Sequence, residues 1–255
     1  MTTILVIPDV QCTKDTPQFH LEWMGQYIVD KRPDVIVCIG DFADMESLSS
    51  YDVGKKQFEG RTYQADIRAA RDNMVTLLSP LSQLQARQAI NKKKVYSPKM
   101  HLTLGNHENR INRAINMDRK LDGLISTNDL CYDLYGWEVH PFLEVVEIEG
   151  IAFSHYFASG AMARPASTAN AQLNKQHMSC VAGHQQGLQI ATGRRADGSL
   201  LNSIIAGSFY LHDEAYMGVQ GNKHWRGALM LHNCKDGSFD LNLLPMTYLR
   251  KKYGV

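Results

Sequence analysis

Apolar and polar positions recur along this chain in two periods, and the first part of the pattern favours a parallel α/β arrangement. Apolar runs of strand length cover residues 3–8 and 34–39, and residues 18–29 between them carry apolar side chains at helical spacing. Pro33 ends that helix before the second strand begins. A strand, a helix and a strand in this order predict parallel strands joined by a right-handed crossover.

The middle of the chain predicts two more helices and one more strand. Residues 61–91 have a long helical pattern, and Pro80 is expected to kink or split it because proline lacks the backbone amide that bonds to the preceding turn. A strand is expected at 100–104 and a further helix at about 109–122. The segment 45–99 therefore forms a helical insertion. It either caps a cleft and selects the substrate or covers the sheet as a helix pair, and the sequence supports the two roles about evenly.

The second half of the chain predicts hairpins. Apolar runs at 143–148 and 151–155 flank Glu149-Gly150, which is typical of a β-hairpin turn. Further strand-like runs lie at 179–182, 203–209, 227–232 and 239–244, with a hairpin turn expected at Lys235 to Ser238. Strands alternating with helices first and with turns later predict two packed sheets, or a parallel sheet extended by antiparallel strands.

The composition is that of an ordinary globular domain. A chain of 255 residues forms one large domain or two small ones. The net charge of +1 creates no global field that demands a nucleic-acid or membrane partner. Five scattered cysteines without C-x-x-C spacing argue against a disulfide framework, and no apolar run approaches the ~20 residues of a membrane span. No basic leader precedes the first strand, so we expect a cytoplasmic protein.

Residue types that bind metals follow the apolar runs where each strand ends. They are, in chain order, Asp9 and Gln11, Asp41, Asn106 and His107, His155, and His184 with Gln186. The carboxyl ends of neighbouring strands meet at one edge of an α/β sheet, so these side chains are expected to converge. A carboxylate such as Asp41 can bridge two cations, and imidazoles and amide oxygens complete each shell. The pattern therefore predicts a dinuclear metal site.

These segments resemble the motifs of the calcineurin-like metallophosphoesterase superfamily, which read D-x-H, G-D-x-x-D, G-N-H-E, a lone H and G-H-x-H. Here they read Asp9-Val10-Gln11, Gly40-Asp41-Phe42-Ala43-Asp44, Gly105-Asn106-His107-Glu108, His155 and Gly183-His184-Gln185-Gln186. One such motif is a weak signal, but five in the right order are a strong one. The resemblance implies an α/β fold, the four-layer αββα sandwich of two mixed sheets flanked by helices, and it favours a single domain, 1–255.

The resemblance also implies roles for the matched residues. One metal would be held by Asp9, Gln11, Asp41 and Gln186, and the other by Asp41, Asn106, His155 and His184. His107 would protonate the leaving oxygen or stabilise the phosphoryl charge, and Asp44 would orient His107. Asn106 and His107 would also contact the substrate. Arg110 and Arg164 are candidates for binding phosphate, with ordinary surface pairing as the alternative.

Two departures from the family pattern fall on the same metal. Gln11 replaces the histidine of D-x-H, and Gln186 replaces the last histidine of G-H-x-H. Two divalent ions are expected. Because an amide oxygen is a weaker and harder ligand than imidazole, the glutamine-containing site should favour Mn²⁺ or Mg²⁺ over Zn²⁺. Mn²⁺ is the first choice, and Zn²⁺, Fe²⁺ and Ni²⁺ remain alternatives. The glutamine-containing site either binds its metal when substrate arrives or stays empty, in which case the protein is a degenerate binding module. The other motif residues are all present, which favours an active enzyme over a degenerate one.

The expected function is hydrolysis of a phosphate ester by a metal-bound hydroxide. A phosphodiesterase acting on nucleotides or nucleic acids, nucleases included, is favoured, because Asp44 is followed by Met45-Glu46 and not by the Arg-Gly of protein Ser/Thr phosphatases. The alternatives are a phosphomonoesterase acting on proteins or metabolites and a non-catalytic metal-binding scaffold. Loops at 207–212 and 221–227 are candidates for substrate contact, although a surface loop is the favoured interpretation of each. The oligomeric state stays open, with a dimer as one option.

Overall fold

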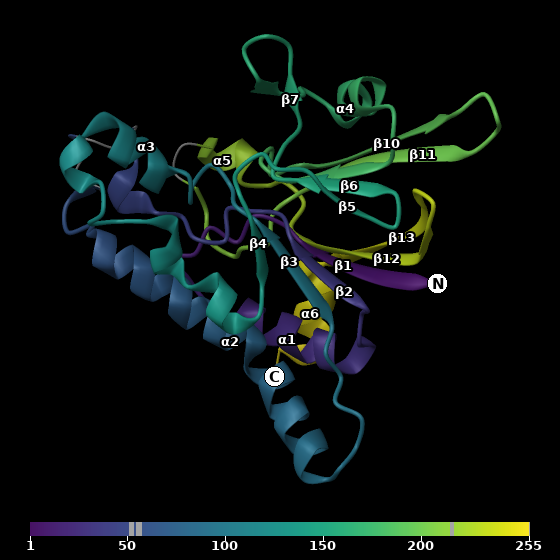
Figure 1. Ribbon diagram of the computed structural model, residues 1–255, viewed down its shortest axis with the longest axis horizontal. Coiled ribbons are helices and arrows are strands. Elements are labelled where there is room, and N and C mark those ends of the chain that lie inside the picture. The colour runs from purple at the N-terminus through teal and green to yellow at the C-terminus, as the bar shows by residue number, and fades with distance from the viewer. Residues whose placement is uncertain (51–53, 55–57, 215–216, 255) are drawn as a thin grey trace.

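Two mixed β-sheets lie face to face, with helices against their outer faces (Figure 1). The structure, a computed structural model, describes residues 1–50, 54, 58–214 and 217–254. The first sheet has the order β13-β12-β1-β2-β3-β4 and the second the order β10-β11-β9-β6-β5. The predicted fold class, two mixed sheets flanked by helices, is confirmed.

The first sheet combines four strands from the first 140 residues with the last two strands of the chain. Its strands are β1 (Thr2–Ile7), β2 (Val35–Cys38), β3 (Lys99–Thr103), β4 (Glu138–His140), β12 (Gly227–Lys235) and β13 (Ser238–Pro245). Strands β1 to β4 pair in parallel, whereas β12 pairs antiparallel with both β1 and β13. The parallel βαβ opening expected from the sequence is therefore confirmed.

The second sheet comes from the middle of the chain. Its strands are β5 (Val146–Ile148), β6 (Ile151–Ser154), β9 (Cys180–Ala182), β10 (Leu188–Arg194) and β11 (Leu200–Ala206). The predicted hairpin β5–β6 turns at Glu149 and Gly150, whose φ angles are 54° and 76°. The predicted hairpin β12–β13 turns in the same way at Asp236 and Gly237, and the Gly237 amide donates to the Glu149 carbonyl at 2.7 Å.

Alternate residues of β1 face two different cores, which explains why its apolar run is continuous. Ile4 and Val6 point between the sheets, where they join Phe153 and Val181 of the second sheet. The intervening β1 residues pack against helices on the outer face. These helices are α1 (Phe19–Lys31), α2 (Tyr63–Ile90) and α6 (Met246–Tyr253), and α4 (Ala169–Gln176) covers the second sheet.

Helix α2 contradicts the expectation that Pro80 splits the long helical pattern, because α2 is one helix from Tyr63 to Ile90. Pro80 faces Gly25 of α1, and a Cβ on Gly25 would lie 2.8 Å from the Pro80 Cγ. The proline thus packs at the crossing of the two helices. Residues 51–53 and 55–57 of the predicted insertion 45–99 lie outside the described residues, and α2 covers the sheet as a single long helix.

Short elements complete the chain. The helix expected at 109–122 is α3 (Arg110–Met117) followed by a 3₁₀ turn at Arg119–Leu121. The others are 3₁₀ turns at Glu46–Leu48, Thr127–Leu130 and Tyr132–Tyr135, the strand pair β7 (Ala158–Ser159) and β8 (Arg164–Pro165), and α5 (Gly218–Gly221). Within the described ranges, no helix is both long and apolar enough to cross a bilayer.

Candidate metal centre

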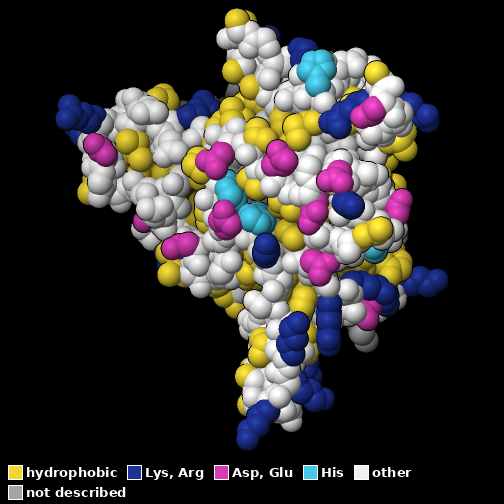
Figure 2. Space-filling view, turned by 45° about the vertical axis from the view of Figure 1, so that its right-hand side comes forward, with side chains coloured by type: hydrophobic (Ala, Val, Ile, Leu, Met, Phe, Trp, Pro, Cys, Tyr) yellow, Lys and Arg dark blue, Asp and Glu magenta, His cyan; other side chains and the backbone are white. Residues whose placement is uncertain are grey.

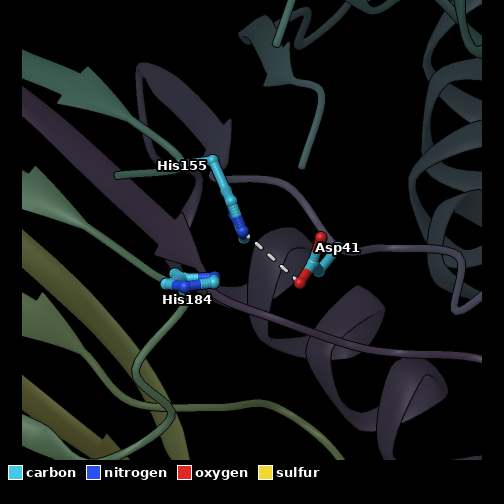
Figure 3. Close-up of side chains that lie close together, drawn as sticks. All are labelled: Asp41, His155 and His184. Atoms are coloured by element: carbon cyan, nitrogen blue, oxygen red, sulfur yellow. Dashed lines mark ion pairs between the residues drawn. The ribbon is translucent and has the colours of Figure 1, made fainter. Parts of the chain in front are cut away.

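The loops that follow five strands meet at one edge of the two sheets. Strands β1, β2 and β3 of the first sheet lead into these loops, as do β6 and β9 of the second. Backbone hydrogen bonds join the loops: the Gln11 amide donates to the Asp41 carbonyl at 2.8 Å, and the Gly183 amide donates to the His155 carbonyl at 2.9 Å. Asp41, His155 and His184 point toward one another from three of them (Figure 3). The predicted strand-end residues therefore form one site.

Nitrogen and oxygen atoms converge at the centre of this site. One ligand atom from each of Asp41, His155 and His184 lies within 4.8 Å of the others. The Asn106 Oδ1 lies 2.8 Å from the His155 Nε2 and 2.7 Å from the His184 Nδ1, and the Asp41 Oδ2 lies 3.4 Å from the His155 Nε2. These four side chains are the set predicted for the second metal.

The orientation of His155 fits a metal ligand. Its Nδ1 lies 2.9 Å from the Ile39 carbonyl, which can only accept, so Nδ1 carries the proton. In the neutral ring Nε2 then presents a lone pair toward the Asp41 and Asn106 oxygens. Burial lowers the pKa of His155, but the Asp41 carboxylate outweighs it and raises the pKa to about 9, so without a metal Nε2 carries a proton toward these oxygens, and a metal ion would take the place of that proton. A histidine that donates its other nitrogen to a backbone carbonyl is the common arrangement of metal-bound imidazole.

Asp9 is held at the bottom of the site. Its two carboxylate oxygens each lie 3.1 Å from the His184 backbone amide, which donates to them. A Cβ on Gly183 would lie 2.4 Å from the Asp9 Oδ1, so the position before His184 has room for glycine only. Burial raises the pKa of Asp9 to about 7, against the favourable charge of His155. Two fully buried carboxylates, Asp9 and Asp41, thus lie in a site that a divalent cation would neutralise.

The two glutamines among the predicted ligands have different surroundings. Gln11 is 1% exposed, and neither its amide nitrogen nor its amide oxygen has a hydrogen-bond partner among the described residues. Such an unsatisfied buried amide is costly unless another group binds it, and a metal ion fits that need. Gln186 is also buried, but its Oε1 accepts a 2.6 Å hydrogen bond from the Tyr210 hydroxyl.

The backbone is strained at four of the predicted ligands. Gln11, Asp41, His184 and Gln186 have φ angles of 47°, 50°, 69° and 59°, in the left-handed region that residues other than glycine rarely adopt. Each such residue costs roughly 1–3 kcal/mol and persists only where the surrounding structure enforces it. The loops therefore hold these four predicted ligands in a backbone conformation that costs free energy, which is typical of residues maintained for their side chains.

His107 lies beside the four converging side chains and is paired with two carboxylates. Its Nδ1 lies 2.5 Å from Asp44 and its Nε2 lies 3.7 Å from the Asp41 Oδ2. Burial lowers the pKa of His107, but the two carboxylates outweigh it, and the pKa is raised above the ordinary value. Arg110 donates to the Asp44 carbonyl at 2.6 Å and lies 3.1 Å from the His107 Nε2. Arg110 thus holds the His107–Asp44 pair.

Glu108, to which the sequence assigned no role, joins two of the loops. One of its carboxylate oxygens accepts from the amides of Asp41 and Gly105 at 3.0 and 2.8 Å, and the other accepts from Ala43 at 2.9 Å. The side chain is fully buried. It fixes Asp41 relative to the loop that carries Asn106 and His107.

Half-buried aromatic rings form one side of the site. The Tyr156 ring lies 4.9 Å from the His184 ring, centroid to centroid, and Phe142 lies 5.6 Å from Tyr156. The 207–212 loop returns to the site, since the Phe209 amide donates to the Asp9 carbonyl at 2.8 Å and Tyr210 reaches Gln186. Arg164, in contrast, is exposed on the β7–β8 pair, outside the converging group.

Comparisons with known proteins give only distant similarities. No family model matches the chain, and no curated protein matches it. Among solved structures, YfcE, a phosphoesterase from E. coli, aligns with 12% identity over 95% of this chain and 99% of its own, with a TM-score of 0.42. A second solved structure aligns with 9% identity over 95% and 99%, with a TM-score of 0.38. In its five ordered motifs and its two mixed sheets flanked by helices, the chain resembles the calcineurin-like metallophosphoesterases.

Proposed function

We propose that this protein is a metal-dependent phosphoric ester hydrolase that acts on phosphodiesters of nucleotides or nucleic acids. The observation that supports the proposal is the convergence of Asp41, Asn106, His155 and His184 from four separate strand ends, with the His107–Asp44 pair alongside. Fully and partly buried ligands next to a carboxylate-paired histidine whose side chain is 12% exposed form the constellation needed for phosphoryl transfer to water.

Each group of the chain has a defined task in this proposal. Asp41, Asn106, His155 and His184 hold one divalent ion, and Asp9, Gln11 and Gln186 join Asp41 in holding a second. Mn²⁺ suits the amide oxygens of the second set better than Zn²⁺ does. Divalent ions bound there supply positive charge for the phosphoryl oxygens and lower the pKa of a bound water.

His107 acts on the leaving group. Asp44 fixes the ring through Nδ1, and the neighbouring carboxylates favour the protonated imidazole, which supplies a proton or positive charge to the departing oxygen. Arg110 contributes by holding Asp44 through the carboxylate and the backbone carbonyl. We therefore treat Arg110 as a positioning residue, and a phosphate contact by Arg164 stays a prediction.

Two features favour diesters. A dianionic monoester calls for extra cationic side chains at the phosphate, but the guanidinium of Arg110 is bound to Asp44 and to the carbonyl of Met45. The Tyr156 ring next to His184 offers a flat apolar surface on which a nucleobase can stack. Both fit a substrate with one negative charge per phosphate and an aromatic base beside it.

The proposal is tested on metal-stripped protein titrated with Mn²⁺, Mg²⁺, Zn²⁺ and Ni²⁺, with bis-p-nitrophenyl phosphate and p-nitrophenyl phosphate as substrates. We expect metal-restored cleavage of the diester, with Mn²⁺ giving the highest rate. His107→Gln should lower kcat by about 10²-fold or more while the bound metal stays the same. A far higher monoesterase rate would reverse the substrate preference. No turnover with any metal would support the scaffold alternative.

The nucleotide preference needs its own measurement. Tyr156→Ala should raise KM for a dinucleotide substrate by about tenfold, since one base–aromatic stack contributes ~1–3 kcal/mol. The kcat for bis-p-nitrophenyl phosphate should change little, and Tyr135→Ala, a half-buried tyrosine near the 3₁₀ turns, serves as the control. An equal effect of Tyr156→Ala on both substrates would argue for a structural role of this ring.

A further inference from the structure

A second cluster of metal-binding residue types lies at the free edge of the first sheet. It consists of His101 on β3 and of Glu138 and His140 on β4, whose ligand atoms all lie within 4.8 Å of one another. We propose that these three side chains bind one divalent transition-metal ion of the Zn²⁺ type, at a site separate from the strand-end centre. This inference does not depend on the proposed hydrolase activity.

The spacing of the ligand atoms fits one ion. The His101 Nδ1 lies 3.2 Å from the His140 Nε2, and the Glu138 carboxylate oxygens lie 3.4 Å from the first nitrogen and 3.8 Å from the second. Metal–ligand bonds of ~2.0–2.1 Å in tetrahedral geometry separate the ligand atoms by about 3.3–3.5 Å. Two imidazoles and a carboxylate are a donor set that Zn²⁺ accepts, and three protein ligands leave the fourth position open.

His140 is oriented as a metal-bound histidine commonly is. Its Nδ1 lies 3.4 Å from the Glu144 Oε1, on the side of the ring away from His101. A carboxylate on the second ring nitrogen fixes the tautomer that leaves Nε2 free, and it increases the basicity of the ring. The side chain of His140 is 10% exposed and that of His101 is 14% exposed, so both rings are held in place.

Strand register explains why these residues meet. In the parallel pair β3–β4, His101 is the partner of Glu138, and Thr103 is the partner of His140. Residues two apart on a strand point to the same face, so Glu138 and His140 both project on the side of His101. In the sequence, this arrangement is indicated only by the E-x-H spacing of Glu138 and His140.

The cluster borders a cavity of about 750 Å³ that favours cations. Its lining carries four carboxylates and one lysine, namely Asp34, Glu138, Glu147 and Glu149 with Lys99. On the face shown in Figure 2, histidine side chains lie among acidic ones. Because acidic side chains outnumber basic ones in this lining, the cavity concentrates cations, so a metal ion can reach the ligands from solvent.

The same two strands lead to the strand-end centre. The Leu104 amide, two residues before Asn106, donates to the His140 carbonyl at 2.9 Å, and Phe142 contacts the His155 ring. A metal ion bound at the edge of the first sheet would crosslink β3 to β4 and stabilise the loops that follow these two strands. Without a metal, the two imidazoles share one hydrogen bond instead, so metal binding and simple pairing are the alternatives that the experiment must separate.

Titration calorimetry of full-length, metal-stripped protein with Zn²⁺ tests the proposal, in a His155→Ala/His184→Ala background that weakens the strand-end centre. We expect one Zn²⁺ equivalent to remain, and Glu138→Gln or His140→Gln to weaken its binding at least tenfold. His232→Gln, on β12 away from the cluster, is the matched control. Unchanged Zn²⁺ affinity in both cluster variants would refute the site.

Three further measurements check the fold of the variant and the identity of the ligands. The side chain of Glu138 is 66% exposed, so Glu138→Gln is expected to fold, which circular dichroism and Tm would verify. Glu144→Gln should weaken Zn²⁺ by about tenfold, as is typical for a carboxylate that orients a metal-bound histidine. X-ray absorption at the zinc edge should show two imidazole nitrogens, and a spectrum with oxygen ligands only would contradict the assignment.

Discussion

Gln11 and Gln186 each follow a predicted ligand by two residues, yet their amide groups have different neighbours. The Gln11 amide is buried without a hydrogen-bond partner among the described residues, whereas the Gln186 oxygen accepts from Tyr210. An amide oxygen that already accepts a hydrogen bond is a poorer metal donor. The metal set that contains both glutamines should therefore be the weaker of the two.

Replacing both glutamines by histidine tests this asymmetry. In the Gln11→His/Gln186→His variant, the metal set that contains positions 11 and 186 should bind Zn²⁺ at least tenfold more tightly, because imidazole is a better Zn²⁺ ligand than an amide oxygen. The metal content after dialysis against limiting chelator measures the change. Gln185→His, in the same loop, is the control, and an equal gain there would show nonspecific binding.

At the level of residues, the sequence predicted the converging group but not the contacts that support it. Each predicted ligand follows an apolar run, so its place at a strand end is a local property of the pattern. Glu108 and Tyr210 act through partners that are distant in sequence, at Ala43 and Gln186, and no local pattern reports such contacts. Arg110 was a candidate for binding phosphate or for ordinary pairing, and its bond to Asp44 depends on how α3 docks.

At the level of elements, Glu108 holds the loop after β2 to the loop after β3. The two carboxylate oxygens of Glu108 accept hydrogen bonds from three backbone amides. In Glu108→Gln one of these oxygens becomes an NH₂ group that cannot accept, so at least one buried amide loses its partner. We expect the free energy of unfolding to fall by about 2 kcal/mol, with reduced turnover because Asp41 shifts. Urea unfolding checks this. Glu22→Gln, on the exposed face of α1, should change nothing, and a wild-type stability for Glu108→Gln would contradict the role.

The crossing of α1 and α2 gives a second prediction at this scale. In an isolated helix, Gly25→Ala would be favourable by about 1 kcal/mol. Here the new Cβ would lie 2.4 Å from the Leu77 carbonyl oxygen, and such overpacking costs about 1–3 kcal/mol. We expect a net loss of stability in thermal unfolding, whereas Gln26→Ala, exposed on the same helix, should be neutral or slightly stabilising. A higher Tm for Gly25→Ala would show that the helices separate easily.

The elements that the sequence missed are those with weak patterns. Strand β4 is a three-residue edge strand with a glutamate and a histidine, and β10 alternates between partly buried and exposed residues. Helix α4 has Leu173 as its one large apolar side chain, which is too little for a helical period. In contrast, β1 and β2 are buried on both faces, so their apolar runs are unbroken and easy to recognise.

At the level of the whole molecule, the two sheets share both a core and a site. The strand-end centre takes residues from position 9 to position 186, so the site forms only when both sheets have packed together. Metal binding is then coupled to folding, because the unfolded chain has no such centre. The sequence predicted the two-sheet arrangement as one of two options, since hairpin patterns alone do not say on which sheet a strand lies.

Global stability should depend on pH through His20, which is buried on α1 beside the Phe209 ring. Burial, and secondarily the nearby His212, lowers the pKa of His20 to about 3. Between pH 6.5 and about 3 the unfolded chain binds a proton that folded His20 does not, so acid favours unfolding. This contribution is on the order of 1 kcal/mol per pH unit in that window, and it is absent above pH 6.5.

His20→Leu removes this contribution while keeping an apolar side chain on the buried face of α1. Urea unfolding at pH 7.5 and pH 5.0, with chelator in both samples, should show a smaller loss of stability on acidification in the variant than in the wild type. The partly exposed His232 gives the control His232→Gln, which should follow the wild type. Equal losses in the wild type and His20→Leu would mean that His20 gains its proton in the folded protein, and that α1 opens to water near pH 5.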